Sequence, residues 1–236
     1  MSQTHNSVIK QLIALGNPQI AAHAQRFFKT APGQYAAGDQ FIGVRVPILR
    51  QLSKRYRDLD LAETEHLLSS PIHEARMLAL LILVLCYQRE PLMQTPIYEL
   101  YLSHTQYINN WDLVDTSADK IVGAHLFERS RQPLRLLAKS TDLWQRRIAI
   151  IATFYFIRRH DFDDTLSLAK RLLDDDHDLI HKAVGWMLRE VGNRDRATME
   201  VFLQQHYRHM PRTMLRYAIE KLPETKRQAY LKGKIA

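Results

Sequence analysis

The segment Trp144-Gln-Arg-Arg-Ile-Ala-Ile150 decides the fold, because its sequence pattern is repeated along the chain. The pattern consists of a polar or basic turn, then a small residue, then apolar packing positions. Three further segments share it, namely His73–Leu80, Ile180–Trp186 and Met210–Ala218. The recurrence spans about 35 residues or a multiple of that, and a helix pair at this period predicts an α-solenoid. Since the TPR consensus is absent, we expect HEAT-like repeats, with a general helical bundle as the alternative.

The rest of the chain agrees with an all-α fold. Of its 236 residues 46% are hydrophobic, and with 8 Gly and 9 Pro it has few of the turn residues that many short strands need. No Gly/Ser-rich linker divides it, so we expect a single domain over residues 1–236, in which residues 1–46 form a less regular helical cap. Ser7 is a plausible N-cap of the first helix. The expected helices are 7–15, 18–29, 47–57, 60–69, 72–89, 94–103, 109–122, 123–129, 132–140, 143–159, 161–174, 177–191, 194–206 and 210–221, with a last one from Pro223.

The charge of the protein indicates a polyanionic partner. The net charge is +8 and the pI is about 9.6, and nucleic acid is the commonest polyanion in a cell. Basic residues recur at one point of the repeats, where a solenoid would align them along a concave basic face that can follow a phosphate backbone. The alternative is a solvated helix face. The recurring cations are Arg76, Arg146 or Arg147, Lys182 and Arg212, and the C-terminal segment adds Arg208, Arg216, Lys221, Lys226, Arg227, Lys232 and Lys234.

The three tryptophans lie beside charged residues at repeat turns. Trp111 and Asp115 are four residues apart, and so share one face of a helix. Trp144 stands three residues before Arg147. Trp186 shares a face with Lys182 and Arg189, where Gly185 allows another helix to approach closely; the full segment is Lys182-Ala-Val-Gly-Trp-Met-Leu-Arg-Glu190. For each tryptophan taken singly, a core anchor is the alternative, and for Asp115 an N-cap or a salt bridge.

An aromatic wall beside a carboxylate suits a cationic substrate, because the indole face and the negative charge both attract positive charge. Alkylation at N3 or N7 of a purine makes such a cation and weakens the glycosidic bond. The base leaves neutral and the sugar becomes an oxocarbenium ion. One carboxylate such as Asp115 could stabilise that cation and position the attacking water.

Together, four segments give the chain a resemblance to the DNA alkylation repair family of HEAT-like repeat glycosylases, the AlkD-like enzymes. The matching segments are 41–52 (Phe-Ile-Gly-Val-Arg-Val-Pro-Ile-Leu-Arg-Gln-Leu), 111–115, 144–150 and 182–190. The resemblance implies hydrolysis of the N-glycosidic bond of cationic N3- and N7-alkylated purines in duplex DNA, without metal or nucleotide cofactor. It also implies contacts to the sugar and phosphates of the lesion rather than base flipping. The first 40 residues match poorly, which leaves their part in gripping DNA open.

The resemblance also assigns roles to individual residues. It implies that Asp115 is the catalytic carboxylate and that Trp111 and Trp186 contact the lesion. It implies that Arg147, or its neighbour Arg146, binds a phosphate. Arg189 is a further contact to the DNA backbone. We expect Asp115 and the two indoles to converge in one site.

The sequence also leads us to expect no metal site, no disulfide and no cofactor, and it leaves two rival functions open. His177 and His181 lack a third ligand at metal-binding spacing, so we expect no metal. The single cysteine, Cys86, excludes an internal disulfide and a multi-cysteine zinc site, and with no signal or membrane-spanning pattern we expect a cytoplasmic protein, nucleoid-associated if bacterial. We expect a monomer that binds duplex DNA and needs no cofactor. The rivals are a non-catalytic DNA-structure binder and a helical scaffold for an acidic protein.

Overall fold

The structure, a computed structural model, describes residues 4–235 and is 67% helical, without strands in that range. It is an all-α, solenoid-like fold, as the sequence predicted. The chain forms two compact units, residues 1–117 and 118–236. The single domain over residues 1–236 that we expected from the sequence stays a prediction.

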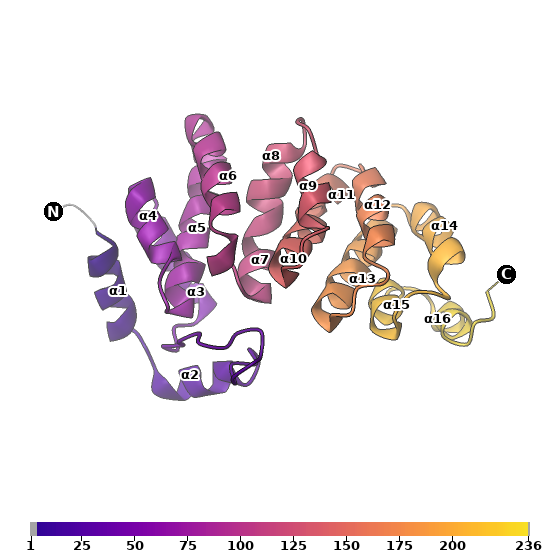
Figure 1. Ribbon diagram of the computed structural model, residues 1–236, viewed down its shortest axis with the longest axis horizontal. Coiled ribbons are helices and arrows are strands. Elements are labelled where there is room, and N and C mark those ends of the chain that lie inside the picture. The colour runs from indigo at the N-terminus through magenta and orange to yellow at the C-terminus, as the bar shows by residue number, and fades with distance from the viewer. Residues whose placement is uncertain (1–3, 236) are drawn as a thin grey trace. The chain divides into compact units, whose positions relative to one another are not determined.

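The first unit is built around α5, its longest helix (Figure 1). The helices α3, α4 and α6 all pack on α5, and α1 packs on α4. Every side chain from Leu78 to Val84 is buried, which explains why α5 is apolar all round. The helices are α1 (His5–Ala14), α2 (Pro18–Gln25), α3 (Val46–Arg55), α4 (Leu61–Leu68), α5 (His73–Arg89), α6 (Gln94–Ser103) and α7 (Trp111–Ala118), with 3-10 turns η1 (Pro91–Met93) and η2 (Thr105–Tyr107).

A buried carboxylate holds the segment that connects α2 with α3. Glu74, 5% exposed at the start of α5, accepts hydrogen bonds from the backbone N–H groups of Ile42, Gly43 and Val44 at 2.7 to 3.3 Å. Gly43 has a φ of +82°, and a Cβ there would lie 2.1 Å from the carbonyl oxygen of Asn17. Only glycine allows this close passage of the segment over α2. Glu74 and Gly43 together therefore fix the N-terminal part of the unit to α5.

The second unit is built around α13, against which α10, α12, α14 and α15 all pack. Gly185 lies where α13 meets α15, and a Cβ there would lie 2.5 Å from the carbonyl oxygen of Met214. The close approach that the sequence predicted at Gly185 is thus present. The elements are the π-helical turn η3 (Asp119–Gly123), α8 (Ala124–Leu126), α9 (Gln132–Leu137), α10 (Leu143–Ala152), α11 (Phe154–Ile157), α12 (Asp163–Arg171), α13 (Asp178–Gly192), α14 (Arg196–His206), α15 (Arg212–Ala218) and α16 (Glu224–Leu231).

The π-helical turn η3 is fixed by packing and by an ionic cluster. A Cβ on Gly123 would lie 2.1 Å from the carbonyl oxygen of Ala152, so glycine lets the turn contact the end of α10. The side chain of Asp119, 2% exposed, pairs with Arg158 at 2.6 Å and with Lys120 at 3.2 Å. The sequence predicted uninterrupted α-helix through residue 122 and did not predict this turn.

Most predicted helices are present, with shifts at their ends. The prediction for residues 94–103 coincides with α6. The helix predicted for 18–29 ends at Gln25 and continues as turns, and the one predicted for 143–159 is divided between α10 and α11 at Thr153. Ser7 is not the N-cap: Thr4 is, and Ser7 completes its capping box as the third residue of α1. A helix able to span a bilayer is not found between residues 4 and 235.

Candidate functional site

The start of α7 presents the first aromatic and acidic pair. Asn110, fully buried, precedes the helix and accepts a hydrogen bond from the backbone N–H of Trp111 at 2.9 Å through its Oδ1. Trp111 and Asp115 are both half-buried, one helical turn apart on α7. The spacing read from the sequence therefore places both side chains along one side of the helix start, and both are reachable from solvent.

Trp111 belongs to a stack of rings from three segments. Phe28 lies nearly parallel to its indole, with ring centroids 5.4 Å apart and planes at 15°. Phe41 stacks on Phe28 at 5.0 Å, and the imidazole of His73 stacks on Phe41 at 4.6 Å. Offset stacking of this kind stabilises aromatic pairs beyond their burial. Phe28 therefore covers one face of the indole.

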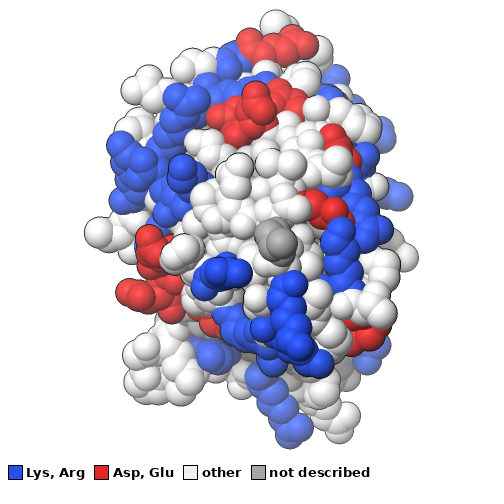
Figure 2. Space-filling view, turned by 90° about the vertical axis from the view of Figure 1, so that its right-hand side faces the viewer, with Lys and Arg blue, Asp and Glu red and all other residues white. Residues whose placement is uncertain are grey.

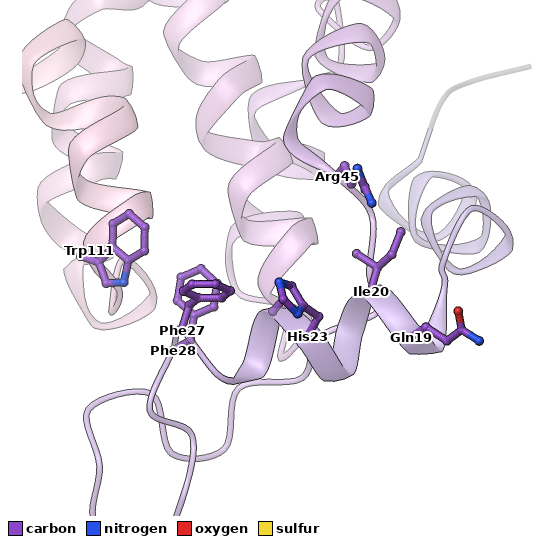
Figure 3. Close-up of a pocket in the computed structure, with 8 residues that line it drawn as sticks. Gln19, Ile20, His23, Phe27, Phe28, Arg45 and Trp111 are labelled. Carbon is purple, nitrogen blue, oxygen red and sulfur yellow. The ribbon is translucent and has the colours of Figure 1, made fainter.

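A pocket of about 740 Å³ opens beside this indole (Figure 3). In Figure 3 His23 lies on α2 and Phe27 and Phe28 on the turn that follows this helix, and Trp111 faces them from the start of α7. Phe27 is 62% exposed, which is unusual for so large an apolar side chain, and Arg45 supplies a cation to the pocket. Exposed aromatic rings next to a cation are typical of surfaces that bind bases and phosphates.

Beneath the stack lies a buried ionic network around His73, which is 3% exposed. Its Nε2 is 2.8 Å from Oδ2 of Asp112, and its Nδ1 is 3.5 Å from Oδ2 of Asp39. Burial lowers the pKa of His73, but the bonds to Asp112 and Asp39 outweigh it and raise the pKa to about 9. For the acid Asp39 burial acts in the opposite direction and raises the pKa, but His73 and Arg76 bring it below its usual value. At neutral pH the network therefore contains a charged imidazolium between two carboxylates.

Arg76 is a correction to the sequence analysis. The period placed it in the basic stripe, but its side chain is 4% exposed and pairs with Asp39 at 2.7 Å. It also donates to the carbonyl oxygen of Ser70 at 2.9 Å. An arginine committed to a buried carboxylate cannot meet a phosphate without opening the core. Arg76 is therefore part of the network, not a DNA contact.

The second unit holds Trp186 on α13 by a different arrangement. The indole Nε1 donates to Glu190 at 3.3 Å, and Glu190 pairs with Arg194 at 2.9 Å. Phe154 lies against the indole with centroids 5.9 Å apart. The guanidinium groups of Arg158 and Arg194 lie 4.5 and 5.6 Å from the ring centroid of Phe154. Trp186 is therefore half-buried among aromatic and cationic side chains. That it joins Trp111 and Asp115 in one site stays a prediction.

The arginines next to Trp144 are used within the protein. Trp144 is a buried anchor, 6% exposed, and Arg147 is 4% exposed and donates to the carbonyl oxygen of Leu179. Arg146 pairs with Asp175 at 2.6 Å. An accessible phosphate-binding arginine was expected at one of these two positions, but Arg147 is buried and Arg146 is half-buried in a salt bridge. Any phosphate contact from either would be made by the small part of the guanidinium that remains exposed.

Of the other predicted DNA-binding cations, Lys182 and Arg212 are more accessible, whereas the side chain of Arg189 is 18% exposed, like that of Arg146. Lys182 pairs with Asp178 at 2.6 Å, and its side chain is 38% exposed. Arg189 pairs with Glu220, and Arg212 is exposed and donates to the carbonyl oxygen of Leu231 at 2.7 Å. Figure 2 shows Lys and Arg gathered on the face at the C-terminal end, interrupted by acidic patches. The predicted concave basic face stays a prediction.

Sequence reasoning missed most of the surroundings of Trp111. His73, Glu74 and Arg76 lie in the first turn of α5, just before its long apolar run, and that polar cluster was the available signal of a buried network. For Phe27 and Phe28 the sequence offers no comparable signal. In the described part of the chain no three His, Cys, Asp or Glu residues are grouped so as to hold a metal ion.

The fold defines an all-α helical-repeat protein. Within that class, the family model for DNA alkylation repair enzymes matches residues 8–222, which is most of the chain. The protein therefore belongs to the DNA alkylation repair enzyme family, and its role lies in the repair of alkylated DNA.

A solved structure supports the fold. The chain is similar to a predicted DNA alkylation repair enzyme from Enterococcus faecalis, with a TM-score of 0.69 and 18% identity, over 89% of this chain and 97% of that one. Comparison with curated proteins gives no match.

Proposed function

We propose that the protein is a monofunctional DNA glycosylase that acts as a monomer on duplex DNA. It hydrolyses the N-glycosidic bond of cationic N3- and N7-alkylated purines, without metal or cofactor and without flipping the base. Family membership supports a repair role. The observation that carries the finer proposal is the start of α7, where Asp115 lies one turn from an indole that borders an open aromatic pocket.

Asp115 is the catalytic carboxylate in this proposal. As the glycosidic bond breaks, positive charge grows on the deoxyribose, and a carboxylate at the site stabilises that charge and orients the attacking water. The alkylated purine is already cationic and leaves as a neutral base, so no general acid is required. One residue is enough for the chemistry.

Trp111 contacts the lesion nucleotide with the part of its indole that borders the pocket. A base cannot be inserted between Trp111 and Phe28 without breaking their stacking. This supports contact with the sugar and backbone rather than a pocket that encloses a flipped base. The exposed ring of Phe27 and the cation of Arg45 extend the same surface.

Trp186, Lys182, Arg189 and Arg212 contribute DNA contacts from the second unit. Lys182 and Arg212 are the most accessible of the predicted cations that recur along the repeats, and they neutralise phosphates, which makes binding salt-dependent. Arg147 and Arg146 contribute mainly by holding α10 to the start of α13 and to Asp175.

The test is release of free 7-methylguanine from methylated duplex DNA under single-turnover conditions. Asp115→Asn is expected to slow excision at least about tenfold, the scale of losing one electrostatic stabiliser, while the affinity for duplex DNA changes little. Asp58→Asn is the matched control, because the side chain of Asp58 is 71% exposed and is remote in sequence from α7; it should excise like the wild type.

The outcomes separate the rivals. Full activity in Asp115→Asn would remove Asp115 from the mechanism. Salt-dependent binding of duplex DNA by a wild-type protein that releases no base would favour a non-catalytic DNA-structure binder. A wild type that prefers duplex DNA no more than a non-specific polyanion would favour a scaffold for an acidic protein.

A further inference from the structure

The ionic network around His73 lies directly against the stack that carries Trp111. His73 is at the first position of α5, Asp112 at the second position of α7, and Asp39 in the segment between α2 and α3. The imidazole thus links three parts of the first unit, its own helix α5 and the two segments that carry Asp112 and Asp39. Its ring also continues the stack through Phe41.

We propose that His73, as an imidazolium, is a positioning residue for Trp111: its hydrogen bond to Asp112 and its ion pair with Asp39 hold the start of α7 and the ring stack on which the indole rests. The proposal of a role in catalysis rests on the proposed function, whereas the positioning of the indole can be tested without it.

The connection from His73 to Trp111 runs along two short routes. The first is covalent, because Asp112 follows Trp111 directly, and its Oδ1 also accepts the backbone N–H of Leu113 at 2.9 Å. The second runs through the rings of Phe41 and Phe28, each about 5 Å from the next. A shift at His73 is therefore transmitted both to the backbone and to the covered face of the indole.

Replacement of the charge should be costly because the two carboxylates depend on it. The side chains of Asp39 and Asp112 are 5% and 16% exposed, and removing the imidazolium takes from Asp112 its ion pair at 2.8 Å and leaves Asp39 with Arg76. The loss of the proton is thus expected to push Asp112 away from Asp39 and to move the start of α7.

The charged groups facing His73 come from three elements. Asp112 lies on α7, Glu74 and Arg76 on α5, and Asp39 in the segment between α2 and α3. Arg45 lines the same cavity of about 360 Å³ as His73, Glu74 and Asp112. Glu74 is bonded to the backbone of 42–44 and Arg76 is paired with Asp39. The pKa of about 9 means that His73 loses its charge as the pH rises from 7 to 10.

The experiment follows the exposure of Trp111 by acrylamide quenching, taking the difference in fluorescence between the wild type and Trp111→Phe in each background. In the wild type the quenching constant is expected to rise at least about twofold along a single-proton step near pH 9. In His73→Gln, which keeps an amide donor for Asp112 but not the charge, quenching should be high already at pH 7 and lack this step. His73→Phe, which keeps the ring in the stack, should behave in the same way.

The matched control is His125→Gln, since His125 is also a buried histidine, 5% exposed, but in the second unit and with a pKa lowered by burial and by Arg129. It should keep the wild-type quenching profile. The single-turnover excision rate of His73→Gln should fall at least about tenfold at pH 7, with duplex affinity within about twofold of the wild type.

The results decide between positioning and a merely structural role. Unchanged quenching of Trp111 and no pH step near 9, in a wild type that stays folded over the range, would overturn the proposal without any variant at His73. Changed quenching with an undiminished excision rate would overturn the catalytic part. A wild type that excises nothing would contradict the proposed function, and the quenching step would still decide whether His73 positions the indole.

Discussion

Trp111 and Trp186 each lie on a helix beside charged residues, but different interactions hold them in the two units. The start of α7 rests on a buried ionic network and a stack of rings that reach it from distant parts of the sequence. The middle of α13 rests on close helix packing at Gly185 and on pairs such as Glu190 with Arg194, which lie on α13 or directly after it. The same pairing of an indole with charged residues can thus be maintained by buried charge or by packing.

The difference has consequences for how each unit responds to change. Buried charges are costly when one partner is removed and depend on pH, whereas packing depends on volume and exposed pairs contribute little. We therefore expect the surroundings of Trp111 to be sensitive to pH, and the helix contact at Gly185, next to Trp186, to be sensitive to added volume.

The largest effect is expected at Glu74 in the first unit. Glu74→Ala leaves the buried N–H groups of Ile42, Gly43 and Val44 without their acceptor. The free energy of unfolding should fall by about 3 to 5 kcal/mol. Urea denaturation measures it, with Glu74→Gln retaining part of the stability and the exposed Glu99→Ala on α6 within about 0.5 kcal/mol of the wild type. A loss below about 1 kcal/mol in Glu74→Ala would contradict the role of this carboxylate.

The next effect is a pH dependence of stability caused by His73. Its folded pKa of about 9 lies above the ordinary value of 6.5, so its contribution is complete below pH 6.5 and is lost as the pH rises through 9. The difference corresponds to about 3 kcal/mol. Urea titrations at pH 6, 8 and 10 should show this decline in the wild type and in His125→Gln, and a much flatter profile in His73→Gln. A wild-type stability that stays level over this range would show that the imidazole is not held as a cation.

The packing of the second unit is tested at Gly185. In Gly185→Ala the added methyl group would lie 2.5 Å from the carbonyl oxygen of Met214 and from Cβ of Tyr217, so α13 and α15 must separate. We expect a loss of about 2 kcal/mol. Gly192→Ala is the control at the end of the same helix: its methyl group meets the flexible side chain of Met199, and the net change should stay within about 1 kcal/mol. Equal losses in the two variants would remove the special role of Gly185.

The fold could be predicted from the sequence to a large extent because helices are encoded locally. The apolar period, Pro18 at a helix start and the breaks around Pro91 are signals within a few residues, and α2 and α6 begin where they indicate. The π-helical turn η3 could not be predicted, since it depends on the contact between Gly123 and Ala152, which are far apart in the sequence. Local patterns therefore predict the elements but not where packing distorts them.

The site could be predicted only in part, for the same reason. Trp111 and Asp115 are one turn apart, so their common helix face follows from the sequence. The partners Asp39, His73 and Asp112 are brought together only by the tertiary fold. A repeat period also does not show which side of a helix faces the core. Arg76 was for that reason assigned to the surface, although it is buried.

The smallest effect on stability, and the sharpest contrast with the network in the first unit, is expected at Lys182. Its pair with Asp178 joins side chains that are 38% and 55% exposed, so Lys182→Ala should change the free energy of unfolding by less than about 0.5 kcal/mol. If Lys182 binds a phosphate, the same variant should weaken duplex DNA binding and reduce the slope of log affinity against log salt by about 1. Asp178→Asn breaks the pair and keeps the cation, and is expected to leave DNA affinity unchanged or higher. Both variants lose the salt bridge between Lys182 and Asp178. If the salt slope falls in both, the fall is caused by the loss of this salt bridge. Only a fall confined to Lys182→Ala supports a phosphate contact by this exposed cation.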